Sequence, residues 1–256
     1  MDDTKLPLLE HLAELRARLA RALLAWAAGF ALAWSFRERV FEFLLRPAIA
    51  SLGGEGTQLQ ALSPPEIFFT YMKCAALAGF LLALPVIFWQ LWAFIAPGLY
   101  DHEKRYAVPF VLVSTALFVG GATFGYVAVF PLVFEFFLTF NNEFVQNAWT
   151  MREVFGFTTR LYLAFGTGFE MPVVVFFLAL SGLLTARQLL AGFKYAVLVC
   201  FLVGAVLTPP DVISQVMLAL PLLALYLVGV AAAFLVNPGR AAEEPELPKV
   251  APPGHV

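Results

Sequence analysis

The residue best placed to carry a function is a single carboxylate, Glu170, inside an apolar stretch long enough to cross a membrane. Hydrocarbon cannot solvate a charge, so an acid at this depth costs about 2.5 kcal/mol or more. Gly166 and Gly168 leave room for close helix packing, and Pro172 frees a backbone carbonyl. This setting favours binding or transport within the bilayer. The alternatives are a hydrogen bond to Thr167 or a neutral, protonated carboxyl.

A second group of acids lies near the N-terminus, where leucines at positions 8, 12, 15 and 19 form the apolar face of a predicted helix. Glu10 and Glu14 stand four residues apart on another face, close to Arg16. Carboxylates held in this way could bind a guanidinium group in bidentate fashion. Arg18 follows Glu14 by four residues, so an ordinary ion pair within the helix is the alternative.

The loop that follows the second apolar segment adds more acid. Pro97 and Gly98 form a predicted turn, and Asp101 and Glu103 come directly after it. These carboxylates would lie on the same side of the membrane as Glu14 and could share a guanidinium partner. Two basic residues at positions 104 and 105 would neutralise them in the alternative of an ordinary charged loop.

Several other classes of chemistry have no support in the sequence. The chain has no phosphate-binding loop of the Gly-x-x-x-x-Gly-Lys-Ser/Thr type. Its three histidines are scattered, and Cys74 and Cys200 lie in apolar runs without the spacing of metal ligands. The net charge of −2 gives no indication of nucleic acid binding. We therefore expect a binding or conducting protein that is not an enzyme, with no metal, cofactor or cleavable signal peptide.

The composition indicates an all-α polytopic membrane protein, because 61% of the 256 residues are hydrophobic and only 13% are charged. A spanning helix needs about 20 apolar residues. Six segments are candidates, and we predict six transmembrane helices at 19–36, 67–95, 108–138, 154–182, 193–207 and 212–236. The fifth would reach only about 22 Å, short of a hydrocarbon core of about 30 Å. Prolines within or beside the segments should kink the helices.

Helix starts and orientation follow from local signals. Capping patterns precede four of the helices, at 63–66, 150–153, 185–188 and 208–211. The last pattern contains Asp211, so a structural role as a helix cap is the alternative to a functional role for this residue. With the N-terminus inside, ten of the 16 basic residues fall on the inner side and six on the outer side. Both termini are then cytoplasmic. We predict a single membrane domain over 1–236 and a disordered cytoplasmic tail over 237–256.

The stretch between the first two predicted spans should form an outer, periplasmic cap. Residues 37–45 place charges on one side and apolar groups on the other, as in a helix that lies at the membrane interface. A glycine-rich turn follows at 53–56, and residues 58–62 read as a short extended piece.

The chain resembles the TatC family, the multispanning receptors of the twin-arginine protein translocase. The resemblance extends to about residue 236 and depends on four motifs, HLAELR (11–16), PGLYDHE (97–103), FGTGFEMP (165–172) and TPPDVISQ (208–215). It implies a receptor for signal peptides that carry paired arginines. By position, Glu14 and Glu103 match the family's acidic signal-peptide site, and we expect Glu10 and Arg16 to belong to the same site.

The resemblance also implies partners within the membrane. Glu170 matches the family's intramembrane acid, which is thought to engage single-span subunits, and we expect Gln215 and Asp211 to join it. The expected partners are TatA-like and TatB-like subunits, other copies of the chain and the lipid bilayer of the inner membrane. The proton-motive force would drive export of folded cargo. The family has six spans, cytoplasmic termini, a concave shape and an outer cap.

Two other functions remain as alternatives. A proton-coupled secondary transporter would use Glu170 as its coupling acid, but such proteins usually contain two related halves, and the sequence has no visible repeat. A membrane scaffold without signal specificity would bind twin-arginine and twin-lysine peptides equally.

Overall fold

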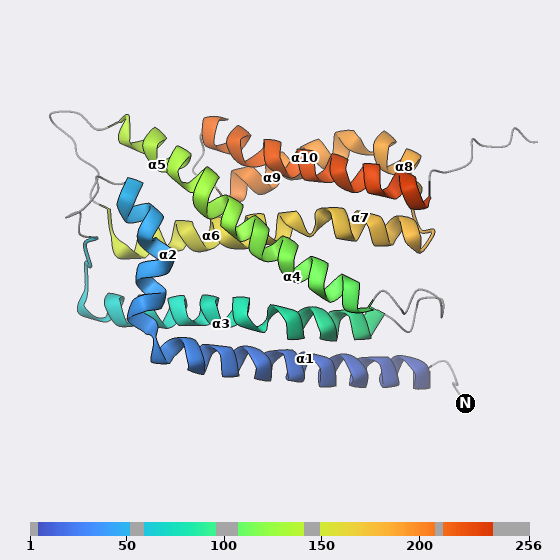
Figure 1. Ribbon diagram of the computed structural model, residues 1–256, viewed down its shortest axis with the longest axis horizontal. Helices are drawn as coiled ribbons and strands as arrows, with labels where there is room; N and C mark the ends of the chain where they lie inside the picture. The colour runs from blue at the N-terminus through green and yellow to red at the C-terminus, as the bar shows by residue number, and fades with distance from the viewer. Residues whose placement is uncertain (1–4, 52–58, 96–106, 141–148, 208–211, 238–256) are drawn as a thin grey trace, which may run out of the picture.

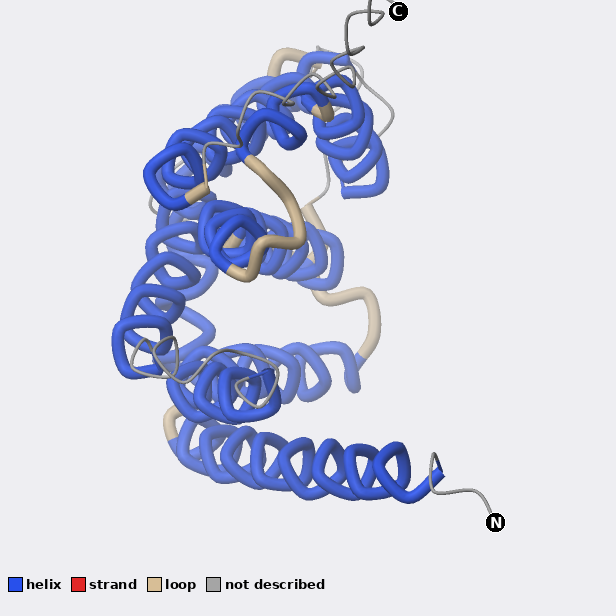
Figure 2. The backbone as a smooth tube through the Cα atoms, turned by 90° about the vertical axis from the view of Figure 1, so that its right-hand side faces the viewer, coloured by secondary structure: helices blue, strands red, loops and turns tan. Residues whose placement is uncertain are grey.

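The computed structural model describes residues 5–51, 59–95, 107–140, 149–207 and 212–237. Within these ranges the regular structure is helical, apart from one isolated bridge between Gln60 and Thr150. The helices are stacked from α1 at one edge to α10 at the other, and the first turn of α1 and the last turn of α10 lie at the same end of the molecule (Figure 1). Viewed along the helices, the stack is curved (Figure 2).

The chain begins with a long helix and a sharp corner. Helix α1 (Lys5–Ser35) joins the predicted amphipathic segment and the first apolar segment into one element, and α2 (Arg37–Ser51) leaves it at an angle of 91°. The corner falls at Phe36. The predicted helix over 37–45 is therefore confirmed and extends six residues further.

Helix α3 (Pro64–Ile95) is the main support of α1. The two backbones touch where Gly29 faces Gly79, because a Cβ atom at residue 79 would lie only 2.4 Å from the backbone nitrogen of Phe30. The Trp26 indole N–H also donates a 2.8 Å hydrogen bond to the carbonyl of Ala76. Such a close approach requires glycine on both helices.

The third predicted segment is interrupted by a π-helical turn. Helix α4 (Ala107–Phe124) continues through the π-helix η3 (Gly125–Val129) into α5 (Phe130–Leu138). Pro131 has no backbone N–H and its ring crowds the preceding turn, so a wider turn there relieves the clash. The helical segment thus changes its hydrogen-bonding pattern just before Pro131.

The fourth segment is broken at its acid. Helix α6 (Met151–Phe169) ends and α7 (Met171–Leu180) begins on either side of Glu170, with Pro172 in the first turn of α7. Thr150 caps α6 by accepting a hydrogen bond from the Glu153 N–H, as the capping pattern predicted. Gly168 faces Leu222 so closely that a Cβ there would lie 2.2 Å from the leucine methyl carbon, so the predicted tight packing is confirmed.

The last three helices complete the fold. Helix α8 (Ala186–Ala191) starts at a full capping box of Thr185 and Gln188, and α9 (Phe193–Leu207) and α10 (Val212–Val236) have the bounds expected from the sequence. The predicted tail differs at its first residue, because the Asn237 amide donates to the carbonyl of Ala179 over 3.2 Å. Residues 238–256 lie outside the described ranges.

The six predicted spans are matched in part by the helices in the described ranges. There, four helices are long and apolar enough to cross a membrane, Pro64–Ile95, Ala107–Leu138, Met151–Leu180 and Gln215–Val236. The number rises to five if the bent pair α1–α2 is one span. The apolar helix Phe193–Val206 is shorter. The chain is thus a multi-pass helical membrane protein.

Helix α2 is held against the bundle by two tyrosines. The Tyr162 hydroxyl donates to the carbonyl of Leu44, and the Tyr126 hydroxyl donates to the carbonyl of Phe43, each over 2.8 Å. Leu45 on α2 is fully buried in the largest hydrophobic cluster. Beyond α2, Gln60 is extended and pairs with Thr150, while the glycine-rich turn lies outside the described residues.

Candidate functional site

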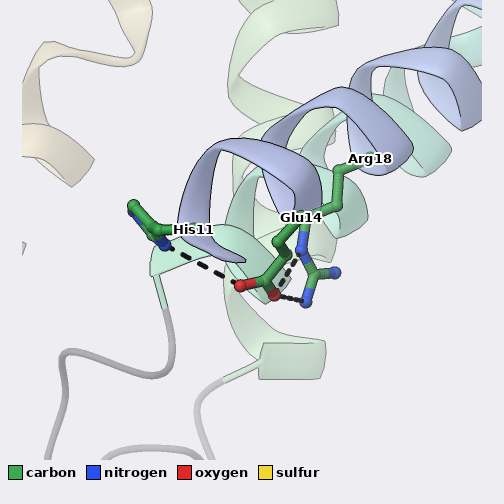
Figure 3. Close-up of polar contacts among 3 residues, drawn as sticks. All are labelled: His11, Glu14 and Arg18. Atoms are coloured by element: carbon green, nitrogen blue, oxygen red, sulfur yellow. Dashed lines mark hydrogen bonds and ion pairs between the residues drawn. The ribbon is translucent and has the colours of Figure 1, made fainter. Parts of the chain in front are cut away.

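Glu14 lies in the third turn of α1 and is already engaged. Its side chain is 34% exposed, and Oε1 accepts hydrogen bonds from Nε of Arg18 over 2.9 Å and from Nη2 of the same residue. Nδ1 of His11 stands 3.8 Å from Oε2 on the other side (Figure 3). The ion pair that the sequence offered as an alternative is therefore present. In this pair two nitrogens of one guanidinium donate to a single carboxylate oxygen.

The start of α1 is fixed against the end of α3 by aromatic stacking. The rings of His11 and Phe94 are stacked, with centroids 4.5 Å apart and an interplanar angle of 19°. Since Phe94 is the penultimate residue of α3, the turn that carries Glu14 lies beside the final turns of α3.

An apolar groove of about 420 Å³ runs along those same turns of α3. It is lined from α3, α4 and α7, together with Glu170 at the α6–α7 break, by Phe88, Leu91, Trp92, Ile95, Phe110, Glu170, Val173, Val174, Phe177, Leu178, Ser181 and Leu183. Among the described residues of this lining, Glu170 alone is ionisable. The groove shares the final turns of α3 with the contact to His11, although Phe94 itself does not line it, and it reaches the acid at the α6–α7 break.

One carboxylate oxygen of Glu170 has no hydrogen-bond donor among the described residues. Its Oε1 atom is buried without one, and so is the hydroxyl of Ser114 on α4. The Ser114 hydroxyl approaches the carboxyl group from the neighbouring helix, but outside the geometry of a hydrogen bond. A buried polar atom without a partner is costly, so this pair is suited to accept a polar group from a ligand or another helix.

The sequence analysis did not identify Ser114 as a candidate site residue. Its side chain is fully buried in α4, within the third predicted apolar segment. Thr115 beside it also carries a buried hydroxyl without a partner in the described part of the chain. Adjacent polar residues inside an apolar run were the signal that could have identified them.

Gln215 lies apart from the groove. Its amide nitrogen donates a 2.9 Å hydrogen bond to the carbonyl of Phe201, which ties α10 to α9. Leu222, the residue of α10 that faces Gly168, stands seven positions further on, about 10 Å along the helix. The groove lining contains no described residue of α9 or α10, so Gln215 and Glu170 do not form one contiguous site in this chain.

The other expected site residues are placed as follows. Arg16 is exposed on α1 and forms no ion pair with a described residue. Glu10 belongs to the first turns of α1, but its side chain lies outside the described part. Glu103 and Asp211 also lie outside it. In the described ranges, no three His, Cys, Asp or Glu residues come together as metal ligands.

The chain matches known proteins over most of its length. Residues 10–221 match the family model described as "Sec-independent protein translocase protein (TatC)". A protein of that name from Desulforapulum autotrophicum is 42% identical over 245 residues, which cover 96% of this chain and 90% of the relative. One from Magnetococcus marinus is 41% identical over 89% of this chain and 84% of its own length.

The fold has the same counterpart. A crystal structure entitled "Twin Arginine Translocase Receptor- TatC" superposes with a TM-score of 0.78 and 38% identity, over 88% of this chain and 99% of the other. The family match, the identities and the shared fold agree with the four sequence motifs, and the chain belongs to the TatC family.

Proposed function

We propose that this chain is the signal-peptide receptor and core subunit of a twin-arginine translocase, which exports folded proteins across the inner membrane. The observation that supports the proposal is that the α1 acid and the apolar groove both lie next to the final turns of α3. The acid on α1 stands beside the last turns of α3, and the apolar groove lined by those turns leads to Glu170. A peptide with a basic start and an apolar continuation has the matching pattern of charge and hydrophobicity.

Recognition of the arginine pair would begin at Glu14. We propose that Glu103 holds the second guanidinium, with Glu10 and Arg16 at the edges of the site. Glu103 lies between Ile95 and Ala107, the ends of α3 and α4, and the end of α3 is next to the Glu14 turn. Carboxylate and guanidinium groups match as forks, which favours arginine over lysine.

Partner helices would use the acid within the bundle. We propose that TatA-like and TatB-like single-span subunits dock at Glu170. Its Oε1 and the hydroxyl of Ser114 both lack a hydrogen-bond partner among the described residues. Gln215 and Asp211, near the start of α10, would form a separate part of the partner surface, and further copies of the chain are also expected as partners. The proton-motive force would supply the driving force.

The full topology is also a proposal. Residues 1–236 would form one membrane domain with six spans and cytoplasmic termini, and residues 37–66 would form a periplasmic cap. The shared end of α1 and α10 in Figure 1 supports termini on one side. Helix α9 has 15 residues and would reach about 22 Å, so the bilayer would be thinner beside it.

Site-specific crosslinking tests the proposal. Photoreactive residues at positions 14 and 103 should crosslink to a twin-arginine peptide, and position 170 should crosslink to a single-span partner helix. A tenfold excess of free twin-arginine peptide should suppress the first two crosslinks, whereas a twin-lysine peptide should not.

Equal competition by the two peptides would instead indicate a scaffold without signal specificity. The absence of peptide crosslinks from positions 14 and 103 in the complete translocase would contradict the receptor assignment.

Arg18 provides a further prediction, because its guanidinium occupies the carboxylate that the signal arginine needs. The substitution Arg18→Gln should strengthen peptide binding about twofold, the value of an exposed ion pair within a helix. The matched control is Arg21→Gln, which removes an exposed charge three residues away without a described ion pair. Binding is measured by fluorescence titration of a labelled peptide, and a loss of affinity in Arg18→Gln would show that Arg18 supports the site.

A further inference from the structure

A second cavity, of about 540 Å³, lies between α3 and α6 at the end of the molecule opposite the start of α1. Both helices begin at this end (Figure 1). Among the described residues, its ionisable lining consists of three basic residues, Lys73, Arg152 and Arg160, and one acid, Glu66. The formal balance of these described residues is three positive charges against one negative charge.

The hydrogen bonds of the acid go to the main chain and not to the three basic side chains. Glu66 Oε2 accepts a 2.8 Å hydrogen bond from the backbone N–H of Leu62, and Oε1 accepts a 3.0 Å bond from the backbone N–H of Arg152. Both oxygens are thus engaged by the main chain. Lys73, Arg152 and Arg160 form no ion pair with any described residue.

Two of the basic residues have their backbone inside the predicted membrane-spanning segments. Lys73 and Arg160 each follow the first residue of their helix by nine positions, about 14 Å along the axis. Side chains on a helix lean toward its N-terminus, so both lean toward this end of the molecule and can reach the headgroup level. Cations at this depth are stabilised when an anion lies within reach.

The cavity also offers a hydroxyl. The Oγ1 atom of Thr159, next to Arg160, is buried and has no hydrogen-bond partner within the described ranges. Phe69 lines the same cavity and is 49% exposed, beside the exposed Phe68. A positively charged cavity with a hydroxyl group and an apolar aromatic border fits an anion that carries hydrocarbon chains.

We propose that this cavity binds the phosphate of an anionic phospholipid from the leaflet on that side. Arginine suits the phosphate oxygens in bidentate contact, and lysine adds a point charge. The acyl chains would lie along the exposed phenylalanines of α3. Free inorganic phosphate shares the recognition chemistry but makes no use of the aromatic border. The site is separate from the groove at Glu170 and does not depend on the export function.

The test is native mass spectrometry of the purified full chain, titrated with phosphatidylglycerol. The double variant Lys73→Gln/Arg160→Gln should bind it about 30-fold more weakly, at about fivefold for each basic residue near a membrane surface. The matched control, Arg39→Gln/Arg46→Gln, removes two exposed charges from α2 that do not line the cavity, and should bind as the parent chain does. Dioleoylglycerol, which lacks the phosphate, should not bind at the site.

Equal lipid affinity in the double variant and the parent chain would overturn the proposal. So would displacement of the lipid by inorganic phosphate at equal concentration, because it would identify the free anion as the ligand. If the double variant does not remain monodisperse, Thr159→Val and Arg160→Gln are tested singly, and unchanged affinity in both would again overturn it.

Discussion

Replacing Glu14 and Glu103 together by lysine should abolish binding of a twin-arginine peptide. Each carboxylate would lose a charge-assisted hydrogen bond, worth about 1.5–3 kcal/mol, and gain a repulsive charge. The two changes together should weaken binding by about 100-fold or more. The measurement is titration of a labelled peptide against the purified chain, with export of a twin-arginine reporter as the second readout. Glu14→Lys alone should have a smaller effect, because Arg18 beside it would lose its partner and move away.

The matched control for this charge reversal is Glu38→Lys/Glu42→Lys on α2. It makes the same change in net charge at two exposed acids. Those acids stand beyond the corner at Phe36, on the helix that packs across the other end of the bundle (Figure 1). Peptide binding should stay within about twofold of the parent chain. If the control loses as much affinity as the double variant, general attraction of a basic peptide explains the binding, and the site assignment is wrong.

The second large effect is expected at the contact of α1 with α3. In Gly79→Val, the new Cβ would stand 2.4 Å from the Phe30 nitrogen and 2.7 Å from the Gly29 carbonyl carbon, which are backbone atoms and cannot rotate away. Helix α1 must separate from α3, at a cost of about 1–3 kcal/mol or more. The stacking of His11 on Phe94 should be lost with it, and peptide binding should fall because Glu14 moves away from the groove.

The control is Gly120→Val on α4, where an added Cβ meets no atom within 4 Å. Thermal unfolding in detergent and crosslinking between cysteines introduced at positions 11 and 94 measure the two effects. Gly79→Val should lower the melting temperature and the crosslinking yield, while Gly120→Val should change neither by much. An undiminished yield in Gly79→Val would mean that the helices accommodate the side chain, and that this contact does not position Glu14.

The sequence predicted elements well where a signal was local. Helices α9 and α10 have the bounds of the predicted segments, because each follows a continuous apolar run. The break at Glu170 follows from Pro172, which has no N–H for the preceding turn. The α2 helix was visible as an amphipathic pattern that starts at Arg37.

Features that depend on contacts between distant segments could not be predicted in this way. The crossing of Gly29 and Gly79 joins residues fifty positions apart, and nothing in either segment alone selects the partner. The neighbourhood of Ser114 and Glu170 has the same origin. At Glu14 the spacing allowed both an internal ion pair and an external ligand. The structure contains the first. The second is the role proposed for Glu14 and requires that Arg18 be displaced.

The two tyrosines that hold α2 have a consequence for how the sequence can drift over evolution. Tyr126 and Tyr162 donate hydrogen bonds to main-chain carbonyl oxygens, which every amino acid possesses. These two hydrogen bonds therefore do not depend on which side chains stand at positions 43 and 44. At position 43 a substitution would remove the ring stacking of Phe43 on Tyr126 but would keep the hydrogen bond to the carbonyl, whereas loss of either phenol would remove an attachment of α2. Variation along α2 and constancy at the two phenols can coexist in a single anchored helix.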